Sequence, residues 1–209
     1  MNNSVTEKSL SYIRYITVTA IMAAVAAVLQ LLEFPLPMLI PPFIKFDFSE
    51  LPALISAFAL GPVSGVTVCL IKNVVKLLTS QSGGIGELAN FLIGACFVGV
   101  AGVIYKHNRT RKGALIACLA GSAAMAVLSL PINYYITYPF YSKFMPIDQI
   151  VRMYQEINPN VNGLVGCLII FNIPFTFMKG VADSIITFAV YKYLSPVIKG
   201  RKNQKKAEG

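Results

Sequence analysis

Charged side chains lie inside long apolar segments of this chain, where each is a candidate for function because a charge is costly in a membrane-like environment. Lys179 and Asp183 are four residues apart, and so are Lys72 and Lys76. Lys179 and Asp183 share a helix face, where they either neutralise each other or leave Lys179 to contact a ligand. The other two lysines repel each other. We expect one to pair with Glu87 or Asp183 and the other to extend toward the membrane surface, unless either contacts the ligand.

Two amide side chains inside apolar segments are also candidates for function. Asn133 interrupts the apolar run 128–136, and Asn90 lies near the start of another apolar segment. An amide without a partner is expensive in lipid, so both side chains must face the protein interior. There they bind either a neighbouring helix or a polar ligand. Asp47 and Glu50 add two carboxylates at the start of a further segment.

The motifs of several enzyme classes are missing from the sequence. It has no G-x-x-x-x-G-K-[ST] loop for ATP phosphates, no H-E-x-x-H, no G-x-S-x-G and no Cys/His cluster with metal-site spacing. The single histidine, His107, lies in a basic stretch that is typical of the flank of a membrane helix. We therefore predict a binding protein that is not an enzyme and has no cofactor. The alternative is a small membrane enzyme that uses Asp47 or Glu50 at the outer face.

The composition places these side chains in a membrane. Of the 209 residues, 56% are hydrophobic and 13% are charged, and the mean hydropathy is +0.65. A soluble domain has about 25% charged residues, so an ordinary soluble enzyme is excluded. The four cysteines stand singly in apolar runs, where we expect them to be small hydrophobic side chains.

We therefore predict an all-α membrane protein with one membrane domain over residues 1–209. Prolines and glycines divide the apolar sequence, and Gly61-Pro62 separates the second segment from the third. We expect Ser49 to cap the second helix and Pro174 to open the last one. The six predicted membrane-spanning helices are 15–32, 49–60, 62–79, 87–105, 113–138 and 174–194.

The basic residues predict the orientation of these helices. With both termini in the cytoplasm, 12 of the 18 lysines and arginines flank the helices on the inside, whereas Lys45, Lys143 and Arg152 lie outside. Basic flanks stay in the cytoplasm and interact with anionic lipid. We therefore expect a multi-pass protein of the bacterial cell membrane. The partner of its net charge of +9 is then the lipid bilayer and not a nucleic acid.

This orientation puts the polar groups inside the membrane in its outer half. At about 1.5 Å per helical residue, Asn90, Asn133 and Lys179 lie about 4–8 Å below the outer ends of their helices, and Asp183 lies about 13 Å down. We expect the inner half to be essentially apolar. The pattern thus predicts a polar pocket that opens to the outside and is closed below, and not a continuous channel.

Small residues recur at a spacing of four in the first helix, which allows another helix to approach closely. Ala20 and Ala24 form one such pair, and Ala23 and Ala27 form a second. Both pairs lie near the cytoplasmic end of the helix. We expect this alanine face to dock another membrane subunit, and the alternative is packing within the bundle.

Several short strings occur together in a characteristic order. They are FDFSELP at 46–52, GPVSG at 61–65, KN at 72–73, ANFL at 89–92, NY at 133–134, and PF with KG at 174–175 and 179–180. In this order and spacing they resemble the riboflavin-specific substrate-binding (S) component of energy-coupling factor (ECF) transporters. The likeness covers almost the whole chain, from about residue 14 to residue 194.

The resemblance implies a six-helix S-component fold that holds riboflavin in its outer half, under the loop that joins the first two helices. It also implies that the alanine face of the first helix docks onto a membrane coupling subunit driven by two ATPase subunits. Riboflavin is then the transported ligand of a vitamin-uptake system. The chain itself is its high-affinity binding subunit.

Site residues follow from the resemblance position by position. Asn133 matches a residue at the polar edge of the isoalloxazine ring, and Lys179 matches a residue at the polar groups of the ligand. Thr176 stands where the family often has Asn, which changes one expected contact to the ribityl chain. Asn90 and Asp47 complete the predicted substrate-binding set.

The residues available suit such a ligand. A tricyclic flavin needs an apolar slot with a few fixed polar groups. Aromatic candidates for its walls are Phe43, Phe46, Phe48, Phe91 and Tyr141. No arginine lies in the predicted pocket, which argues against a phosphorylated flavin as the preferred substrate. The alternative on the same scaffold is a different vitamin.

Overall fold

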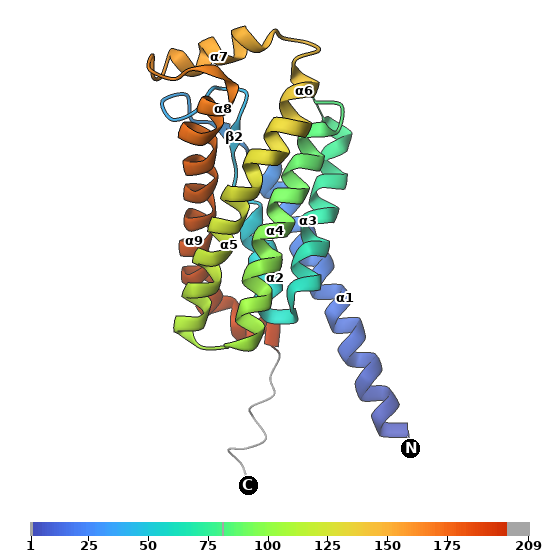
Figure 1. The fold of residues 1–209 in the computed structure, drawn as a ribbon. Coiled ribbons are helices and arrows are strands. Elements are labelled where there is room, and N and C mark those ends of the chain that lie inside the picture. Colours follow the sequence, from blue (N-terminus) through green and yellow to red (C-terminus); the bar gives the residue numbers. More distant parts are fainter. Residues whose placement is uncertain (1, 81, 200–209) are drawn as a thin grey trace.

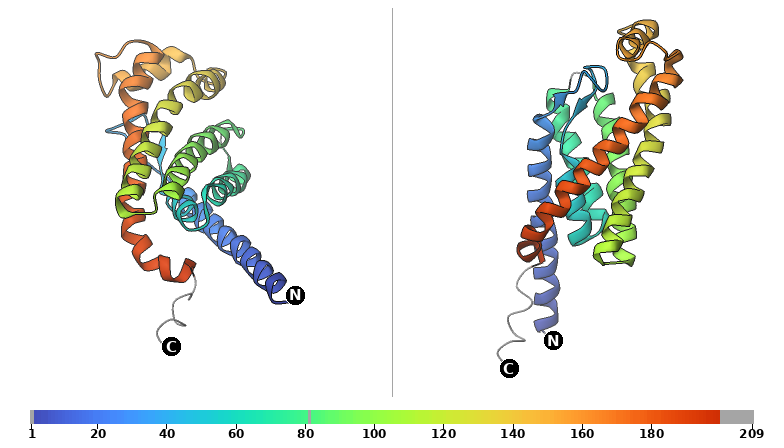
Figure 2. Two further views of the ribbon diagram at one scale, coloured as in Figure 1. Left: turned by 60° about the horizontal axis from the view of Figure 1, so that its bottom comes forward. Right: turned by 90° about the vertical axis from the view of Figure 1, so that its left-hand side faces the viewer.

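Long helices run side by side through the computed structural model, which describes residues 2–80 and 82–199, with side chains from 12 to 80 and from 82 to 190 (Figure 1). The helices along the bundle are α1 (Asn2–Leu31), α3 (Pro62–Lys76), α4 (Ile85–His107), α5 (Arg111–Ile132) and α9 (Ile173–Lys199). The start of α1 and the end of α9 lie at the same end of the bundle, as the views in Figure 2 also show.

Five helical stretches of the described residues are long and apolar enough to cross a membrane. These are Tyr12–Leu31, Pro62–Thr79, Ile85–His107, Arg111–Tyr141 and Gly163–Val190. The predicted second span is a helix, α2 (Glu50–Leu60), but its 11 residues extend only about 16 Å and are too few to cross a bilayer alone. Most of α2 is buried within the bundle. Gly61, at a φ of 110°, then turns the chain into α3.

The last span begins earlier than the sequence predicts. Helix α8 (Gly163–Cys167), the π-helical segment η3 (Leu168–Asn172) and α9 follow one another without a break. Pro174 therefore lies inside a long helical run and does not open it. The fifth span is extended in the same way, since η2 (Asn133–Thr137) and α6 (Tyr138–Tyr141) continue α5. Smaller differences concern α1, which starts at Asn2, and α3, which ends in the 3-10 turn η1 (Leu77–Thr79).

Proline explains why both long spans contain a π-helical segment. A proline ring inside an α-helix clashes with the carbonyl group four residues earlier and removes one hydrogen bond. For Pro139 that carbonyl belongs to Tyr135 in η2, and for Pro174 it belongs to Ile170 in η3. A wider turn with hydrogen bonds five residues apart relieves the clash. The two widened turns flank the region between α5 and α9.

The opposite end of the bundle from the start of α1 is covered by short elements. The strands β1 (Phe34–Pro35) and β2 (Lys45–Phe46) pair antiparallel, with Phe34 opposite Phe46. Helix α7 (Ile147–Gln155) lies across this end, as Figures 1 and 2 show. It is amphipathic, and it buries Ile150 and Tyr154 against the bundle.

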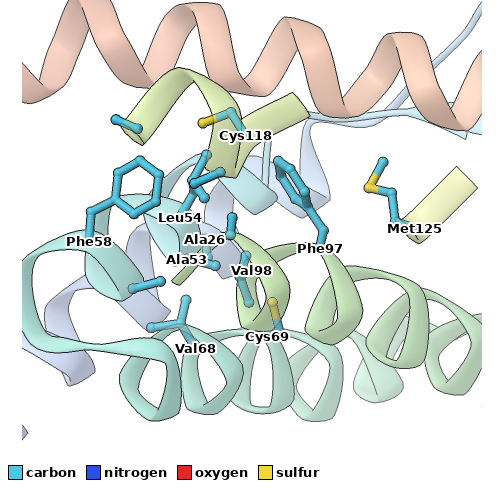
Figure 3. Close-up of a cluster of buried hydrophobic side chains, with 14 of the residues drawn as sticks. Ala26, Ala53, Leu54, Phe58, Val68, Cys69, Phe97, Val98, Cys118 and Met125 are labelled. Atoms are coloured by element: carbon cyan, nitrogen blue, oxygen red, sulfur yellow. The ribbon is translucent and has the colours of Figure 1, made fainter. Parts of the chain in front are cut away.

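Two groups of buried apolar side chains support this arrangement. One fills the bundle between α1, α2, α3, α4 and α5 and includes Leu54, Phe97 and Met125 (Figure 3). The other lies beneath α7 and includes Tyr138 and Tyr154. Close helix contact depends on glycine at Gly65, where a Cβ atom would lie 2.8 Å from the Ala53 backbone oxygen. Helices α2 and α3 therefore pack at backbone distance.

Candidate functional site

A cavity of about 630 Å³ lies at the covered end of the bundle, between the β1–β2 hairpin and the long helices. This volume is typical of a small-molecule site. All five residues that the sequence predicts for substrate binding line it, and they come from four parts of the chain: Asp47, Asn90, Asn133, Thr176 and Lys179. The structure therefore brings together side chains that are up to 132 residues apart.

An ionic cluster forms the floor of the cavity. Lys179 Nζ lies 3.0 Å from Asp47 Oδ2 and 2.8 Å from Glu50 Oε2. Lys72, which is fully buried, donates to Glu50 Oε1 at 2.6 Å and to the hydroxyl group of Ser49. Buried charges are tolerated when they are paired and hydrogen-bonded, as these are. The cluster ties the start of α2 to α3 and α9.

The ion pairs differ from those expected. Lys179 does not pair with Asp183, which lies one turn further into the bundle and whose carboxylate oxygens have no hydrogen-bond partner among the described residues. Lys72 pairs with Glu50 and not with Glu87 or Asp183. A helix spacing of four shows which side chains share a face, but the partner on a neighbouring helix depends on packing.

Ser49 holds the Asp47 carboxylate in the cavity floor. Asp47 Oδ1 accepts hydrogen bonds from the backbone N–H of Ser49 at 2.8 Å and from its hydroxyl group. Burial alone would raise the pKa of Asp47, but Lys179, Lys72 and the bonds from Ser49 lower it well below its usual range. Ser49 stands at the N-cap position of α2, but its side chain makes no capping bond. The predicted cap is therefore wrong, because this hydroxyl group serves the ionic cluster instead.

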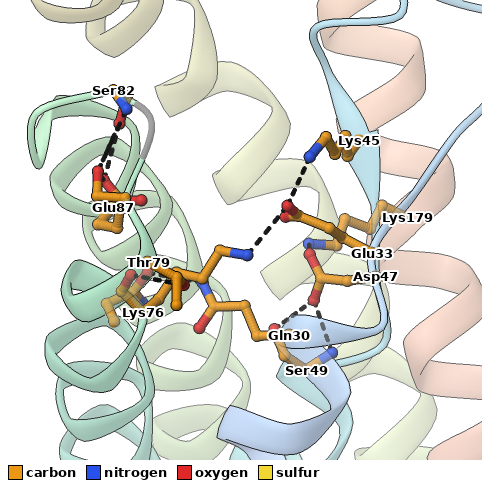
Figure 4. A network of polar contacts seen from close by, with 12 residues as sticks. Gln30, Glu33, Lys45, Asp47, Ser49, Lys76, Thr79, Ser82, Glu87 and Lys179 are labelled. Atoms are coloured by element: carbon orange, nitrogen blue, oxygen red, sulfur yellow. Dashed lines mark hydrogen bonds and ion pairs between the residues drawn. The ribbon is translucent and has the colours of Figure 1, made fainter.

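The rim of the cavity carries another ionic contact. Glu33 Oε1, just after α1, accepts from Lys45 Nζ at 2.8 Å and from Lys76 Nζ at 3.0 Å (Figure 4). Burial would raise the pKa of Glu33, but hydrogen bonds from Lys45 and then Lys76 lower it below its ordinary value. Lys76 thus pairs with an acid that the sequence analysis did not consider. Glu33 fastens strand β2 to α3 beside the cavity.

Several polar atoms that border the cavity lack a partner. Gln30 Oε1, Asn90 Oδ1 and Thr137 Oγ1 are buried and make no hydrogen bond with the described residues. The amide nitrogen of Gln30 is occupied, because it donates to Asn73 Oδ1 at 3.0 Å. An unsatisfied buried polar group costs about 1–3 kcal/mol. These atoms are therefore places where water or a polar ligand completes the hydrogen bonding.

The walls of the cavity are largely apolar. Of the predicted aromatic residues, Phe43 and Tyr141 line it, and Tyr138 and Phe175 join them. The other three predicted aromatic residues pack in the two apolar cores: Phe46, Phe48 and Phe91. The cavity thus combines aromatic walls with a charged floor. The described residues contain no group of three His, Cys, Asp or Glu side chains that could hold a metal ion.

The half of the bundle away from the cavity is less apolar than expected. Thr19 on α1, Ser56 on α2 and Ser64 on α3 are buried, and their hydroxyl groups are hydrogen-bonded at 2.7 and 2.6 Å. Thr187 on α9 is also fully buried. Charged and amide side chains indicated the polar sites in the sequence, whereas small hydroxyl groups were not used as a signal. The bonded hydroxyl groups of Thr19, Ser64 and Ser56 join α1, α3 and α2 in this half of the bundle.

The alanine face of α1 is divided by the structure. Ala20 and Ala24 are exposed and lie beside other exposed apolar side chains of α1, such as Ile21. Ala23 and Ala27 are buried against the bundle. The burial of Ala23 and Ala27 contradicts the prediction of a docking face made by all four alanines, because the bundle already covers one side of that face. Only the Ala20–Ala24 pair is available to a partner.

Sequence reasoning missed Asn172 as a cavity residue. Like Asn133, it is an amide surrounded by apolar residues, Leu168–Phe171 before it and Ile173 after it. That signal was present, but the expected helix start at Pro174 placed Asn172 in a loop. Glu50, also at the cavity, was recognised as a carboxylate but not included in the substrate-binding set.

Comparisons with known proteins relate the chain to one family of transport proteins. Residues 14–191 match the family model described as "ECF transporter, substrate-specific component". The chain is 34% identical over 190 residues to the riboflavin transporter RibU of Staphylococcus aureus, covering 89% of this chain and 92% of that protein. It is 28% identical over 194 residues to the riboflavin transporter FmnP of Bacillus subtilis, covering 91% and 97%.

A solved structure is similar as well. It is described as the S component of a bacterial ECF transporter, and it superimposes with a TM-score of 0.70 at 31% sequence identity. The match covers 89% of this chain and 98% of that chain. The likeness therefore extends over nearly the whole of both folds.

Proposed function

Because this chain belongs to the family of ECF transporter substrate-specific components, we propose that it is the riboflavin-binding subunit of a bacterial vitamin importer. The observation that carries the proposal is the cavity, in which aromatic walls meet unpaired amide and hydroxyl groups. The relatives are transporters, and the chain is a transport subunit and not an enzyme.

Riboflavin suits this cavity in size and polarity. Its isoalloxazine ring is a flat aromatic body with hydrogen-bonding groups along one edge, and its ribityl chain carries only hydroxyl groups. Phe43, Tyr141 and Phe175 provide apolar contact, and Asn90 and Thr137 offer unpaired oxygens. Such a ligand needs amides and hydroxyl groups more than it needs a free cation.

Within the cavity, the resemblance suggests a role for each predicted residue. Asn133, at the start of η2, hydrogen-bonds the polar edge of the ring. Thr176, three residues before Lys179, faces the ribityl chain together with Asn90. Lys179 and Asp47 neutralise each other at 3.0 Å, and Lys179 also offers a hydrogen atom to the ligand.

A phosphorylated flavin suits the cavity less well. Its lining contains no arginine among the described residues. Its three lysines, Lys45, Lys76 and Lys179, are each already paired with a carboxylate. A phosphate group would have to displace one of these carboxylates. We therefore propose that unphosphorylated riboflavin is the preferred substrate.

The proposal includes the membrane setting and the partners. The cavity end of the bundle faces outward and both chain ends lie in the cytoplasm, with α2 counted as the sixth, short membrane segment. The basic cluster expected at the cytoplasmic end, 192–206, lies outside the described side chains. Ala20 and Ala24 contact a membrane coupling subunit, which two ATPase subunits drive.

Fluorescence quenching tests the binding function directly. The full-length chain is purified in detergent without added vitamin and titrated with riboflavin, whose fluorescence falls when its ring stacks on aromatic side chains. We expect saturable quenching at submicromolar riboflavin and a weaker affinity for flavin mononucleotide, which is fluorescent itself and is titrated separately. Thiamine and biotin serve as negative controls. A folded protein that does not quench riboflavin at micromolar concentration contradicts the proposal.

A further inference from the structure

A closed ring of hydrogen bonds lies beside the cavity. The Tyr154 hydroxyl group donates to Asn172 Oδ1 at 2.7 Å, and the hydroxyl groups of Tyr138 and Tyr154 are hydrogen-bonded to each other. Asn172 Nδ2 donates to the Tyr138 hydroxyl oxygen at 3.5 Å. All three side chains are buried. They come from α6, α7 and η3, so the ring joins the covering helix to both long spans.

Counting the hydrogen atoms fixes the direction of the ring. A tyrosine hydroxyl group has one hydrogen atom. Since Tyr154 gives its hydrogen to Asn172, Tyr138 must give its hydrogen to Tyr154, and Asn172 closes the ring by donating to Tyr138. Both tyrosine hydrogens are then used. Only one hydrogen in the ring remains without an acceptor, and it is the second N–H of the Asn172 amide.

That remaining donor belongs to a cavity residue. Asn172 and Tyr138 line the cavity, whereas Tyr154, on α7, does not. The Asn172 side chain makes no other hydrogen bond with the described residues. A buried amide normally satisfies its hydrogens. A ligand atom in the cavity that accepts a hydrogen bond would complete the set.

We propose that Asn172 donates a hydrogen bond to the flavin ring and that Tyr154 is a positioning residue that fixes the direction of its amide. The inference rests on the proposed riboflavin-binding function and adds a specificity residue to it. The flavin ring offers two carbonyl oxygens and two unprotonated nitrogens, which only accept, and a single donor, its N3–H group. If the amide were turned over, its oxygen would face these atoms and repel them. Tyr154 opposes this turn, because its hydroxyl group donates to Oδ1 at 2.7 Å.

Three variants of the full-length chain separate the roles. Asn172→Leu removes the donor and keeps a similar volume, and Tyr154→Phe removes only the hydroxyl group. Tyr135→Phe is the matched control, since Tyr135 is 73% exposed and outside the cavity. We expect Asn172→Leu to weaken riboflavin binding about tenfold or more and Tyr154→Phe to weaken it several-fold. Tyr135→Phe should bind as the wild type does.

The double variant tests whether Tyr154 acts through Asn172. If it does, the effects are not additive, and Asn172→Leu/Tyr154→Phe binds within about twofold of Asn172→Leu alone. Infrared difference spectra of bound riboflavin add a readout that folding defects do not produce. The carbonyl and ring bands should shift in Asn172→Leu and, by a smaller amount, in Tyr154→Phe. This signal remains informative for any variant that is less stable, because it is recorded on the bound fraction.

The outcomes are distinct. Wild-type affinity and unchanged bands in Asn172→Leu overturn the inference, as does a Tyr154→Phe variant that loses thermal stability but neither affinity nor band position. Fully additive effects in the double variant overturn the positioning role of Tyr154. Failure of the proposed function looks different, because the wild type itself would then show no riboflavin binding.

Discussion

Lys179 Nζ and Asp47 Oδ2 lie 3.0 Å apart although 132 residues separate them in the chain. The contact joins α9 to the segment between β2 and α2, and Lys179 also contacts Glu50 at 2.8 Å. One ammonium group therefore serves two carboxylates that are both buried. This arrangement makes the cavity floor a structural element as well as part of a binding site.

Removing the charge of Lys179 should destabilise the fold. In Lys179→Met, Asp47 loses its direct ionic partner and Glu50 keeps only Lys72, and breaking a buried pair in this way costs about 3–5 kcal/mol. The double variant Lys179→Met/Glu50→Gln removes one charge of each sign and should recover part of that loss. Thermal unfolding in detergent measures both. A Lys179→Met protein with wild-type stability would show that the cluster does not need this charge.

Asn133→Ala should weaken riboflavin binding by about 1–3 kcal/mol, because a polar group of the ligand is left without its partner. Asn160→Ala provides the control, since Asn160 is an exposed amide that does not line the cavity. Titration of riboflavin fluorescence gives both affinities. Equal affinity in Asn133→Ala and the wild type would remove Asn133 from the proposed site.

Neighbouring alanines of α1 should respond differently to the same substitution. Ala24→Leu adds volume to an exposed face, so we expect riboflavin binding to persist while uptake by the assembled transporter falls. Ala23→Leu adds the same volume to a site that is 1% exposed, and overpacking there costs about 1–3 kcal/mol of stability. Uptake assays in cells and unfolding of the purified chain distinguish the two. Normal uptake in Ala24→Leu would contradict docking through this face.

The ion pairs of Glu33 should stabilise the fold in a pH-dependent way. Its folded-state pKa is lowered, so its ion pairs with Lys45 and Lys76 stabilise the fold above the ordinary value of 4.5 and are lost as the pH falls through the lowered pKa. The Tm difference between the wild type and Glu33→Gln should therefore be constant down to about pH 4.5 and shrink below it. Glu156→Gln, at an exposed acid, is the control. A difference that grows on acidification would reverse the assigned sign.

Much of the architecture could be predicted from hydropathy and proline. The apolar stretches located the long helices, and costly polar groups such as Asn133 and Lys179 indicated which side chains converge. What could not be predicted is which partner each charge meets. Lys72 finds Glu50 and Lys76 finds Glu33 because α2 and the end of α1 approach α3. Such contacts depend on crossing geometry, which spacing along one helix does not contain.

The prediction that Pro174 opens the last helix was wrong. A proline after an apolar run usually marks a helix start, but Pro174 lies inside a helix because η3 widens the turn before it. The consequence was a missed cavity residue, Asn172.

Each π-helical segment holds one residue more than a regular helical turn. The loss of one residue there therefore affects the two spans differently from a loss elsewhere in the helix. Losing a single residue from η3 would keep α8 and α9 in their rotational phase, but it would bring back the clash between Pro174 and the carbonyl group four residues before it. The same loss one turn later would swing everything beyond it by about 100° and turn Asp183 toward lipid. A change of chain length within η2 or η3 would therefore alter the cavity wall locally, because Asn133 and Asn172 lie in these two segments and line the cavity.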